Sequence, residues 1–387
     1  MANAWTNQPT SDQVERAATE AVVDEEPVVT KPFEPKVDTP SYEINQYLLQ
    51  RVAIFRELTR LREKGWGDPA GDEFFARQRC QADSPSNKQA KVFFGIMKNI
   101  GRELHAHTGV FGIRAPDGRP PRILDMCMAP GGYLEVAMQY NPGARARAFT
   151  LPLKNGGHRV LLRPNPNIVI TSVDITMMAA DMGIDSIPQA HPDANNFLPR
   201  QLHPWDVFDL AICDGQVLRT HTRASYRENR ESARLTLTQL AMSLEHLRPG
   251  GTILMLMHRI ESWKSVIILR MFSKFSVVHV YKPKTSHRNR SSCYLVASNI
   301  QPEHEDAVRA VGTLKQLWRS ATFDTEEEFR RLNKSMSPDV KEVLKDFGPR
   351  LVKLGKQVWQ RQAEALAEAP WTQLQSAVLP SCGDERS

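Results

Sequence analysis

Residues able to bind a ligand stand together in the stretch RILDMCMAPGGYLEVAM, residues 122–138. An apolar run ends at Asp125, a Pro-Gly-Gly turn follows, and the next residues have the spacing of an amphipathic helix. Glycines let the backbone approach a ligand closely, and a helix that starts there presents its positive end. The stretch therefore predicts a site for a ligand that carries a carboxylate or a phosphate.

Other phosphate-binding and metal-binding patterns are missing from the sequence. Neither GxGxxG nor GxxxxGK[ST] occurs, so neither a dinucleotide nor a nucleoside triphosphate is expected. The five cysteines form no CxxC pair and have no histidine at metal spacing, which favours reduced core thiols over a metal site or disulfides. They are Cys80, Cys127, Cys213, Cys293 and Cys382.

Composition limits the classes of partner. The chain has 387 residues, of which 41% are hydrophobic and 24% charged, enough for one substantial core and a helical addition. A net charge of +6 suits an anionic partner such as RNA, although many ordinary basic proteins share it. No apolar run approaches the roughly 18 residues of a membrane span, and the first residues lack a basic region followed by an apolar one. We expect an intracellular protein, cytoplasmic or nuclear, with no membrane partner.

The chain divides into four predicted parts. Residues 1–40 lack periodicity and predict a disordered tail. Residues 41–87 predict a helical N-terminal extension in which one helix begins near Ser41, and residues 88–300 predict the main domain. Residues 301–387 predict a helical C-terminal extension with a disordered end. Packing against the main domain is the expected role of this extension, and binding of a partner is the alternative.

Strands and helices alternate within the main domain. The expected strands are Ile123–Cys127, Arg147–Leu151, Ile168–Asp174, Phe208–Cys213, Thr252–Met257, Ser276–Tyr281 and Cys293–Ala297. The expected helices are Lys88–His105, Tyr133–Tyr140, Arg227–Leu247 and Ser262–Phe272. This order is typical of an α/β fold with a mostly parallel sheet covered on both faces and a ligand crevice at the carboxyl ends of its strands. The short segment KPKTSHRNR predicts an antiparallel hairpin at the C-terminal edge.

Four segments resemble, in order, the FtsJ/RrmJ-type ribose 2′-O-methyltransferases. They are Asp125 with APGG and an aromatic residue, FDLAICDG at 208–215, LRPGGT at 247–252, and KPKTSH at 282–287 followed by SSCYLV at 291–296. The likeness extends over residues 88–299. It implies a Rossmann-like SAM methyltransferase fold, S-adenosyl-L-methionine as the cofactor and RNA as the substrate.

The resemblance also implies which residues bind the cofactor. They are Asp125, Ala129, Pro130, Gly131, Gly132, Tyr133 and Asp174. The amino-acid end of the cofactor is expected near Asp125 and the loop, and the adenosine near Asp174. A turn or capping role is the alternative for Asp174.

The family is understood to use a Lys-Asp-Lys-Glu tetrad, which this sequence matches only in part. Asp214 fits the first acid, and Lys98 is the preferred N-terminal lysine, with a solvated surface lysine as the alternative. The second lysine position falls on Leu256 and the glutamate position on Ser292. His258 would lie on the same side of an extended strand as residue 256 and has a suitable pKa, although a locally bonded histidine is the alternative.

The incomplete tetrad leaves three hypotheses open. The first is an active RNA ribose 2′-O-methyltransferase with a rearranged site. The second is an inactive methyltransferase-like protein that binds RNA as a scaffold, and the third is an SAM enzyme that acts on another hydroxyl or an amine. The cofactor loop favours SAM binding in the first and third, and the missing lysine favours the second or third.

Two basic segments bear on the RNA hypothesis. One contains Arg219, Arg223, Arg227, Arg230 and Arg234, and the other is the turn at residues 282–290. Because both follow strands that end near one another, they could form a cationic channel for a phosphate backbone. A salt-bridged solvent face is the alternative for the arginines at helical spacing.

Overall fold

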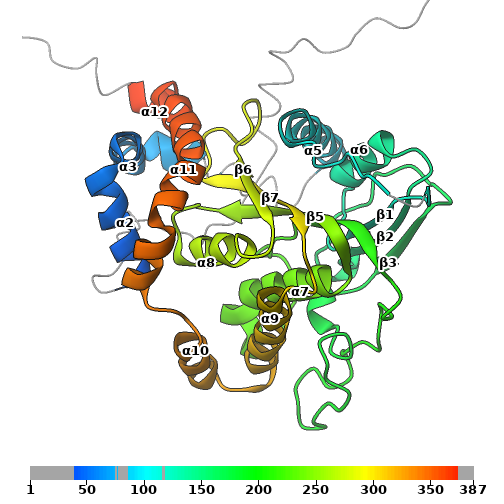
Figure 1. The fold of residues 1–387 in the computed structure, drawn as a ribbon. Coiled ribbons are helices and arrows are strands. Elements are labelled where there is room, and N and C mark those ends of the chain that lie inside the picture. Colours follow the sequence, from blue (N-terminus) through cyan, green and yellow to red (C-terminus); the bar gives the residue numbers. More distant parts are fainter. Residues whose placement is uncertain (1–38, 75, 77–85, 116–117, 374–387) are drawn as a thin grey trace, which may run out of the picture.

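The computed structural model describes residues 39–74, 76, 86–115 and 118–373 (Figure 1). The tail predicted at residues 1–40 lies outside the described residues, apart from Thr39 and Pro40. The predicted disordered C-terminal end also lies outside them, from residue 374 onward.

A single seven-stranded sheet forms the centre of the molecule. Its strands are β1 (Arg122–Asp125), β2 (Arg145–Thr150), β3 (Ile168–Ser172), β4 (Phe208–Cys213), β5 (Leu247–His258), β6 (Val277–Tyr281) and β7 (Ser292–Ile300). They are ordered β3-β2-β1-β4-β5-β7-β6. β1 to β5 pair in parallel, and β7 runs antiparallel to both β5 and β6. The predicted Rossmann-like α/β fold with an antiparallel C-terminal hairpin is thereby confirmed.

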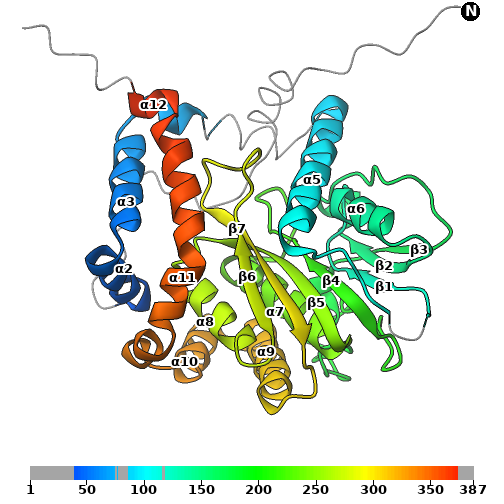
Figure 2. The same ribbon diagram turned by 45° about the horizontal axis from the view of Figure 1, so that its top comes forward.

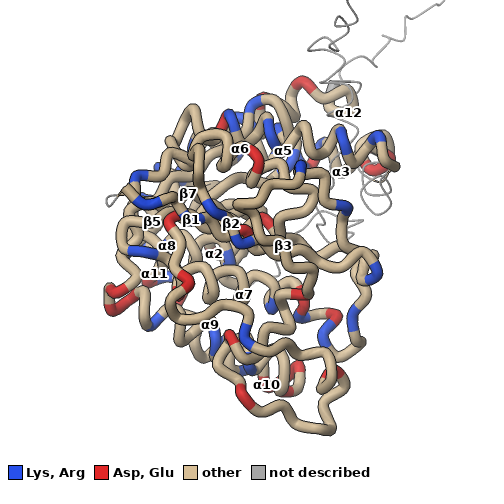
Figure 3. Tube along the Cα trace, turned by 90° about the vertical axis from the view of Figure 1, so that its right-hand side faces the viewer, with Lys and Arg blue, Asp and Glu red and all other residues tan. Residues whose placement is uncertain are grey.

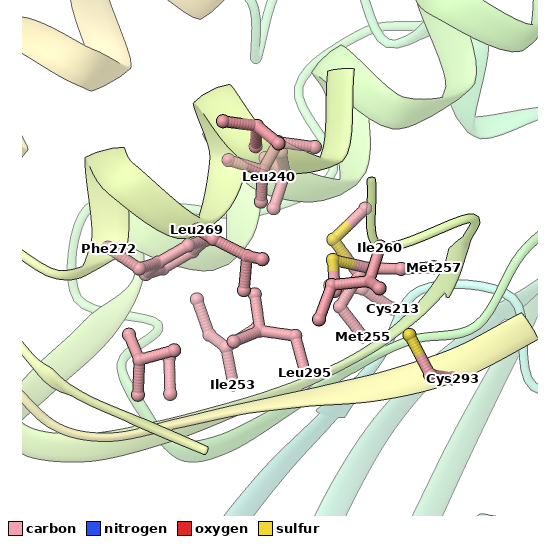
Figure 4. Close-up of a cluster of buried hydrophobic side chains, with 14 of the residues drawn as sticks. Cys213, Leu240, Ile253, Met255, Met257, Ile260, Leu269, Phe272, Cys293 and Leu295 are labelled. Atoms are coloured by element: carbon pink, nitrogen blue, oxygen red, sulfur yellow. The ribbon is translucent and has the colours of Figure 1, made fainter. Parts of the chain in front are cut away.

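Helices cover the two faces of the sheet (Figures 1 and 2). α5 (Asn87–Thr108) and α6 (Gly132–Tyr140) lie on one face, and α7 (Glu231–Glu245) and α8 (Trp263–Phe272) on the other. Side chains of β5 alternate between these faces, as a strand requires. Leu254 and Leu256 join the hydrophobic cluster of α5 and α6. Ile253, Met255 and Met257 join that of α7 and α8, drawn in Figure 4.

The cover is incomplete at the β3 edge, which corrects the prediction of a sheet covered on both faces. Val169 is 52% exposed and Ile170 is 41% exposed. The connections on either side of β3, residues 151–167 and 173–207, are fully described and contain no α-helix, only short turns such as η1 (Leu153–Asn155) and η2 (Ile175–Met177). Both connections are therefore available to line a site instead of packing on the sheet.

The terminal helices join the edge of the sheet beyond β6 (Figure 2). α2 (Pro40–Arg51) and α3 (Ala53–Trp66) replace the single helix predicted from Ser41, because the backbone at Val52 is extended. α11 (Val340–Ala367) packs along α3, and α12 (Pro370–Gln373) contacts both helices. We call α2, α3, α11 and α12 the annex.

Two further C-terminal helices lie below the sheet in the view of Figure 1. α9 (Glu305–Phe323) packs on α7, and α10 (Glu326–Ser335) follows it. A capping box begins α10, with Thr325 as the N-cap residue. The Glu328 amide donates to Thr325 Oγ1 at 3.3 Å, and the Thr325 amide donates to Glu328 Oε2 at 2.9 Å.

Candidate active site

A cavity of about 150 Å³ opens at the carboxyl ends of the parallel strands, where the sequence predicts a crevice. Residues that follow β1, β3 and β4 line it, together with Leu256 of β5 and Tyr294 of β7. Phe93 and Met97 of α5 form one of its walls. The cavity therefore unites loops from most of the sheet with one covering helix.

Two neighbouring carboxyl groups lie beside this cavity, and one of them lines it. Asp125 ends β1, is 1% exposed and accepts a hydrogen bond from the Cys127 amide at 3.2 Å. Asp214 follows the neighbouring strand β4 and lines the cavity, and its Oδ1 is buried without a hydrogen-bond partner among the described residues. Burial raises the pKa of Asp214 to about 7. Burial, and then the charge of Asp214, raise the pKa of Asp125 well above its ordinary value, so the pair retains a proton near neutral pH.

The Pro-Gly-Gly turn connects β1 to α6 beside the two acids. Ala129 and Tyr133 line the cavity. Gly131 has a φ of 106° and caps α6, a conformation that favours glycine. A Cβ on Gly132 would lie 2.4 Å from the Met97 Cβ, so this glycine is required by the close approach of α5 rather than by a ligand. The Pro130 carbonyl accepts a hydrogen bond from the Leu161 amide at 3.0 Å, which ties the turn to the β2–β3 connection.

Asp174 caps η2, which confirms the capping role considered for it, and it also lines the cavity, so its contact with the adenosine stays a prediction. Its Oδ1 accepts from the Thr176 amide at 3.0 Å, and its Oδ2 lies 3.2 Å from Arg227 Nη1. Arg227 is 5% exposed and also pairs with Glu231, a second acidic residue of the cavity, at 2.8 Å. Buried ion pairs thus fix the end of the cavity beyond β3.

Two histidines close the cavity from different loops. His158 belongs to the β2–β3 connection and His221 to the segment after β4, and the Thr222 amide joins these loops by donating to the Asn155 carbonyl at 3.1 Å. His221 Nδ1 accepts from the Leu218 amide at 3.2 Å. Burial lowers the pKa of His158, and burial, His158 and Arg223 lower the pKa of His221 to about 4. Both rings are therefore neutral at pH 7.

The structure does not bring Lys98 into the cavity. Its Nζ lies 3.0 Å from Glu135 Oε1 and 4.8 Å from the centre of the Phe94 ring, on the side of α5 that faces α6. Its role as the N-terminal catalytic lysine stays a prediction, to which these contacts add no support. Phe93 and Met97 occupy the positions on α5 that do face the cavity.

His258 lies at the margin of the cavity. It ends β5, and its Nε2 is 3.0 Å from Oε1 of Gln216, a cavity residue. Its partner in the β5–β7 register is Ser292, which is 1% exposed. A catalytic role for His258 therefore stays a prediction, with Gln216 as the contact between it and the cavity.

Lysine and arginine are absent from the cavity wall as far as the structure describes it. Leu256, at the position where the family resemblance leads one to expect a lysine, contributes an apolar surface. The acidic residues of the cavity wall are Asp174, Asp214 and Glu231. Because Asp174 and Glu231 are paired with Arg227, Asp214 is the wall acid whose charge, when it is ionised, would attract a ligand with positive charge.

The predicted cationic channel is wrong for three of its arginines. Arg227, Arg230 and Arg234 are at most 5% exposed. Arg234 lies 2.7 Å from Glu231 Oε2, and Arg230 donates to the Asp324 carbonyl at 2.6 Å. Arg230 and Arg234 connect the main domain to α9 and its C-terminal end, whereas the partners of Arg227 lie within the main domain. Buried guanidinium groups need such acidic or carbonyl partners.

Sequence reasoning did not single out Phe93, Met97, His158 or Gln216. His158 lies in a segment without periodicity, and Gln216 stands two residues after Asp214, which is the one signal that pointed to it. The Gly215 amide donates to Gln239 Oε1 at 2.9 Å, and this bond fixes the loop on which Gln216 stands. Within the described ranges, no cluster of His, Cys, Asp or Glu has the geometry of a metal site.

The chain is similar in sequence to known proteins. A family model described as FtsJ-like methyltransferase matches residues 103–300 of the 387-residue chain. The chain is 29% identical over 181 residues to the pre-rRNA 2′-O-ribose RNA methyltransferase FTSJ3 of Gallus gallus, which covers 46% of this chain and 18% of that protein. The Rattus norvegicus protein of the same name is 28% identical over 188 residues, covering 48% and 19%. The chain spans less than a fifth of the length of these curated relatives.

Solved structures are more distant. Human methyltransferase-like protein 13 in complex with SAH aligns with a TM-score of 0.33 and 14% identity, over 64% of this chain and 98% of that one. TrmN from Thermus thermophilus aligns with a TM-score of 0.29 and 15% identity, over 52% and 49%. At these scores, neither structure bears on the chemistry of the site. Among the described helices, none has the length and apolar character needed to cross a membrane.

Proposed function

Since this chain belongs to the FtsJ-like methyltransferase family, we propose that it binds S-adenosyl-L-methionine in the cavity and transfers the methyl group to a ribose 2′-hydroxyl of RNA. The observation that carries this proposal is Asp214, a cavity acid with a buried, unpartnered oxygen beside the turn that follows β1. RNA as the substrate rests on the relatives, and the cofactor rests on the family and on the fit of the cavity.

One acid of the cavity wall is available to a cofactor with positive charge. S-adenosylmethionine carries a sulfonium and an ammonium group, and Asp214, unlike Asp174 and Glu231, has an oxygen with no partner among the described residues. We place the amino-acid end near Asp125 and the loop Ala129–Tyr133, and the adenosine near Asp174. When bound, the cofactor supplies an electrophilic methyl group.

Asp214 supports the acceptor chemistry. A ribose hydroxyl must be aligned with the methyl group and must lose its proton as the new oxygen–carbon bond forms. The unpartnered Asp214 Oδ1 can accept that proton or its hydrogen bond, and a pKa of about 7 leaves a substantial fraction of Asp214 ionised at neutral pH. His258 would act through Gln216, which it contacts at 3.0 Å.

One observation favours a second candidate function. Leu256 and Ser292 stand where the family resemblance implies a lysine and a glutamate, so the proton acceptor at this site differs from the one expected. An SAM enzyme that acts on an amine needs no lysine base, because an amine nucleophile is already reactive when neutral. One that acts on another hydroxyl would rely on positioning of the acceptor and on Asp214 to take its proton. An RNA-binding protein without turnover is the third outcome.

Exposed cations support an RNA substrate. Lys284, in the turn between β6 and β7, and Arg219, after β4, are both exposed at the edge of the sheet that carries the cavity. α5, which forms a wall of the cavity, contains four Lys or Arg and one acidic residue, and Figure 3 shows its basic positions along the tube. A phosphate backbone would be attracted to this edge.

The test is methyl transfer from labelled S-adenosylmethionine to total RNA, followed by digestion to nucleosides. The proposal expects labelled 2′-O-methyl nucleosides. Label in a base or in a small molecule would support the second candidate. Binding of S-adenosylhomocysteine in calorimetry with no transfer to any acceptor would support the protein without turnover, and absence of binding at millimolar concentration would remove the cofactor site.

A further inference from the structure

The turn between β6 and β7, residues 282–291, reaches from the sheet edge to the cavity. His287 lines the cavity and adopts a φ of 59°, so the backbone of the turn is unusual at the residue that contacts the site. The turn also carries the exposed Lys284 and the half-exposed Arg288. The conformation of this turn therefore sets the positions of the His287 side chain, which lines the cavity, and of the cations Lys284 and Arg288.

Lys282 holds the turn from within. It is completely buried, and its Nζ donates to the carbonyls of His287 at 2.6 Å and Ser292 at 2.8 Å, and also to the Arg290 carbonyl. A lysine ammonium has three donors, and burial makes each unmatched donor costly. Lys282 therefore binds both limbs of the turn together.

α5 supports the turn from one side. Glu103 accepts hydrogen bonds from the Lys284 amide at 2.9 Å and from the Thr285 hydroxyl. The same glutamate lies 3.4 Å from the Tyr281 hydroxyl. One carboxylate thus fixes the start of the turn to the helix that forms a wall of the cavity.

α11 of the annex supports the turn from the other side. Arg361 donates to the Lys282 carbonyl, and its guanidinium lies 4.7 Å from the centre of the Tyr281 ring. Gln362 Nε2 donates to the Asn289 carbonyl at 3.3 Å, and Arg288 pairs with Glu368 at 2.9 Å. These contacts come from outside the segment that the family model matches, residues 103–300.

A buried cluster anchors α11 in this position. Glu261, 4% exposed, accepts from Arg62 of α3 at 2.8 Å and from the Trp359 indole at 3.1 Å. Arg62 also donates to Gln362 Oε1 at 2.6 Å. Because Glu261 lies three residues beyond the end of β5, the cluster ties α3 and α11 to the segment that follows His258. The annex is a fixed part of this side of the molecule.

We propose that Arg361 is a positioning residue that holds the turn 282–291, and with it His287, as the acceptor-side wall of the cavity. This inference rests on the proposed function for the identity of the acceptor. It assigns the annex a role in binding the methyl acceptor. The cofactor end of the cavity is bounded by Ala129, Asp174 and their neighbours, and none of the described side-chain hydrogen bonds from Arg361 or Gln362 reaches these two residues.

The test compares Arg361→Met with Arg361→Lys and with Arg350→Met, an exposed arginine of the same helix as the matched control. Hydrogen–deuterium exchange of peptides that cover residues 282–291 reports on the turn directly. Calorimetry with S-adenosylhomocysteine reports on the cofactor end, and methylation of total RNA gives KM and kcat.

Arg361→Met is expected to speed exchange of the turn by about tenfold, the loss of one hydrogen bond from a charged donor. The KM for RNA should rise by a similar factor, with little change in kcat or in S-adenosylhomocysteine affinity. Arg361→Lys should restore part of both effects, because lysine can still donate to the carbonyl, and Arg350→Met should change neither.

Unchanged exchange of the turn in Arg361→Met would overturn the positioning role. A loss of S-adenosylhomocysteine affinity by the same factor as the rise in the KM for RNA would also overturn it, because it would indicate general damage. Faster exchange with an unchanged KM would overturn the link to the acceptor. If the wild type transfers no methyl group to RNA, the proposed function fails, while the exchange measurement still decides whether Arg361 fixes the turn.

Discussion

Asp125 and Asp214 stand at the carboxyl ends of two hydrogen-bonded parallel strands, and burial together with the charge of Asp214 raises the pKa of Asp125. Asp214 is the member of the pair that reaches the cavity. Burial raises the pKa of Asp214 to about 7, so this acid titrates near neutrality. When Asp214 is ionised, its charge disfavours ionisation of Asp125.

Asp214→Asn tests whether this carboxylate takes part in transfer. Asparagine keeps the size of the side chain but cannot accept a proton, so kcat should fall by about 10²- to 10⁴-fold, the usual share of a general base. The affinity for S-adenosylhomocysteine should change little in calorimetry, because Asp125 and the loop at 129–133 remain. Transfer at the wild-type rate would show that Asp214 is not the proton acceptor.

The pH dependence of transfer should follow the ionisation of Asp214. Because the pKa is raised to about 7, the ionised form increases as pH rises, and kcat/KM should climb through pH 7 and level off above it. A profile already flat at pH 5.5 would mean that the essential group has an ordinary carboxyl pKa. The same titration in Asp214→Asn should lack this limb.

Stability should respond to the same group with a definite sign. Asp214 has an ordinary pKa of 3.8 and a folded pKa of about 7, so between these values the folded state binds more protons and Asp214 lowers stability as pH rises. Asp214→Asn removes this effect. The difference in melting temperature, variant minus wild type, should therefore grow from pH 4 to pH 7 and stay constant above. A difference that shrinks over this interval would contradict the raised pKa.

Apolar runs were enough to predict the sheet. All six residues of β4, Phe208–Cys213, are buried, and the strand has the bounds expected from the sequence. A strand of a central parallel sheet must be apolar on both faces, so its pattern is unambiguous. The turn after β1 and the acid after β4 could likewise be placed at one edge, since parallel strands end together.

Orientation of single side chains could not be predicted in the same way. Lys98 and Met97 are adjacent on α5, yet only Met97 faces the cavity, because the rotation of the helix is set by its packing on Gly132. The spacing of Arg227 and Arg234 is the same for a solvent face and for a buried cluster. Asp174, which pairs with Arg227, and the Thr176 carbonyl, which accepts from Arg234, come from a distant loop, and a helix pattern carries no information about them.

Arg227→Met is expected to destabilise the fold. It removes the partner of three carboxylates, those of Asp174, Asp193 and Glu231, and leaves them close together with little solvent. Breaking a buried ion pair in this way costs about 3–5 kcal/mol, measured by urea denaturation. Arg350→Met, at an exposed arginine of α11, is the control and should change stability by less than about 0.5 kcal/mol. Equal effects of the two substitutions would show that the Arg227 cluster adds nothing to stability.

Gly132→Ala and Gly95→Ala form a matched pair that separates packing from backbone entropy. A Cβ on Gly132 would lie 2.4 Å from the Met97 Cβ and 2.8 Å from the Phe94 carbonyl oxygen, so α5 must shift, at a cost of about 1–3 kcal/mol. A Cβ on Gly95, inside α5, meets nothing within 4 Å, and alanine there should stabilise the helix by about 0.5–1 kcal/mol. Urea denaturation should thus give changes in the free energy of unfolding of opposite sign.

Because Met97 also lines the cavity, Gly132→Ala should weaken S-adenosylhomocysteine binding as well, whereas Gly95→Ala should leave it unchanged. Destabilisation by both substitutions would mean that α5 is not packed on the turn as described.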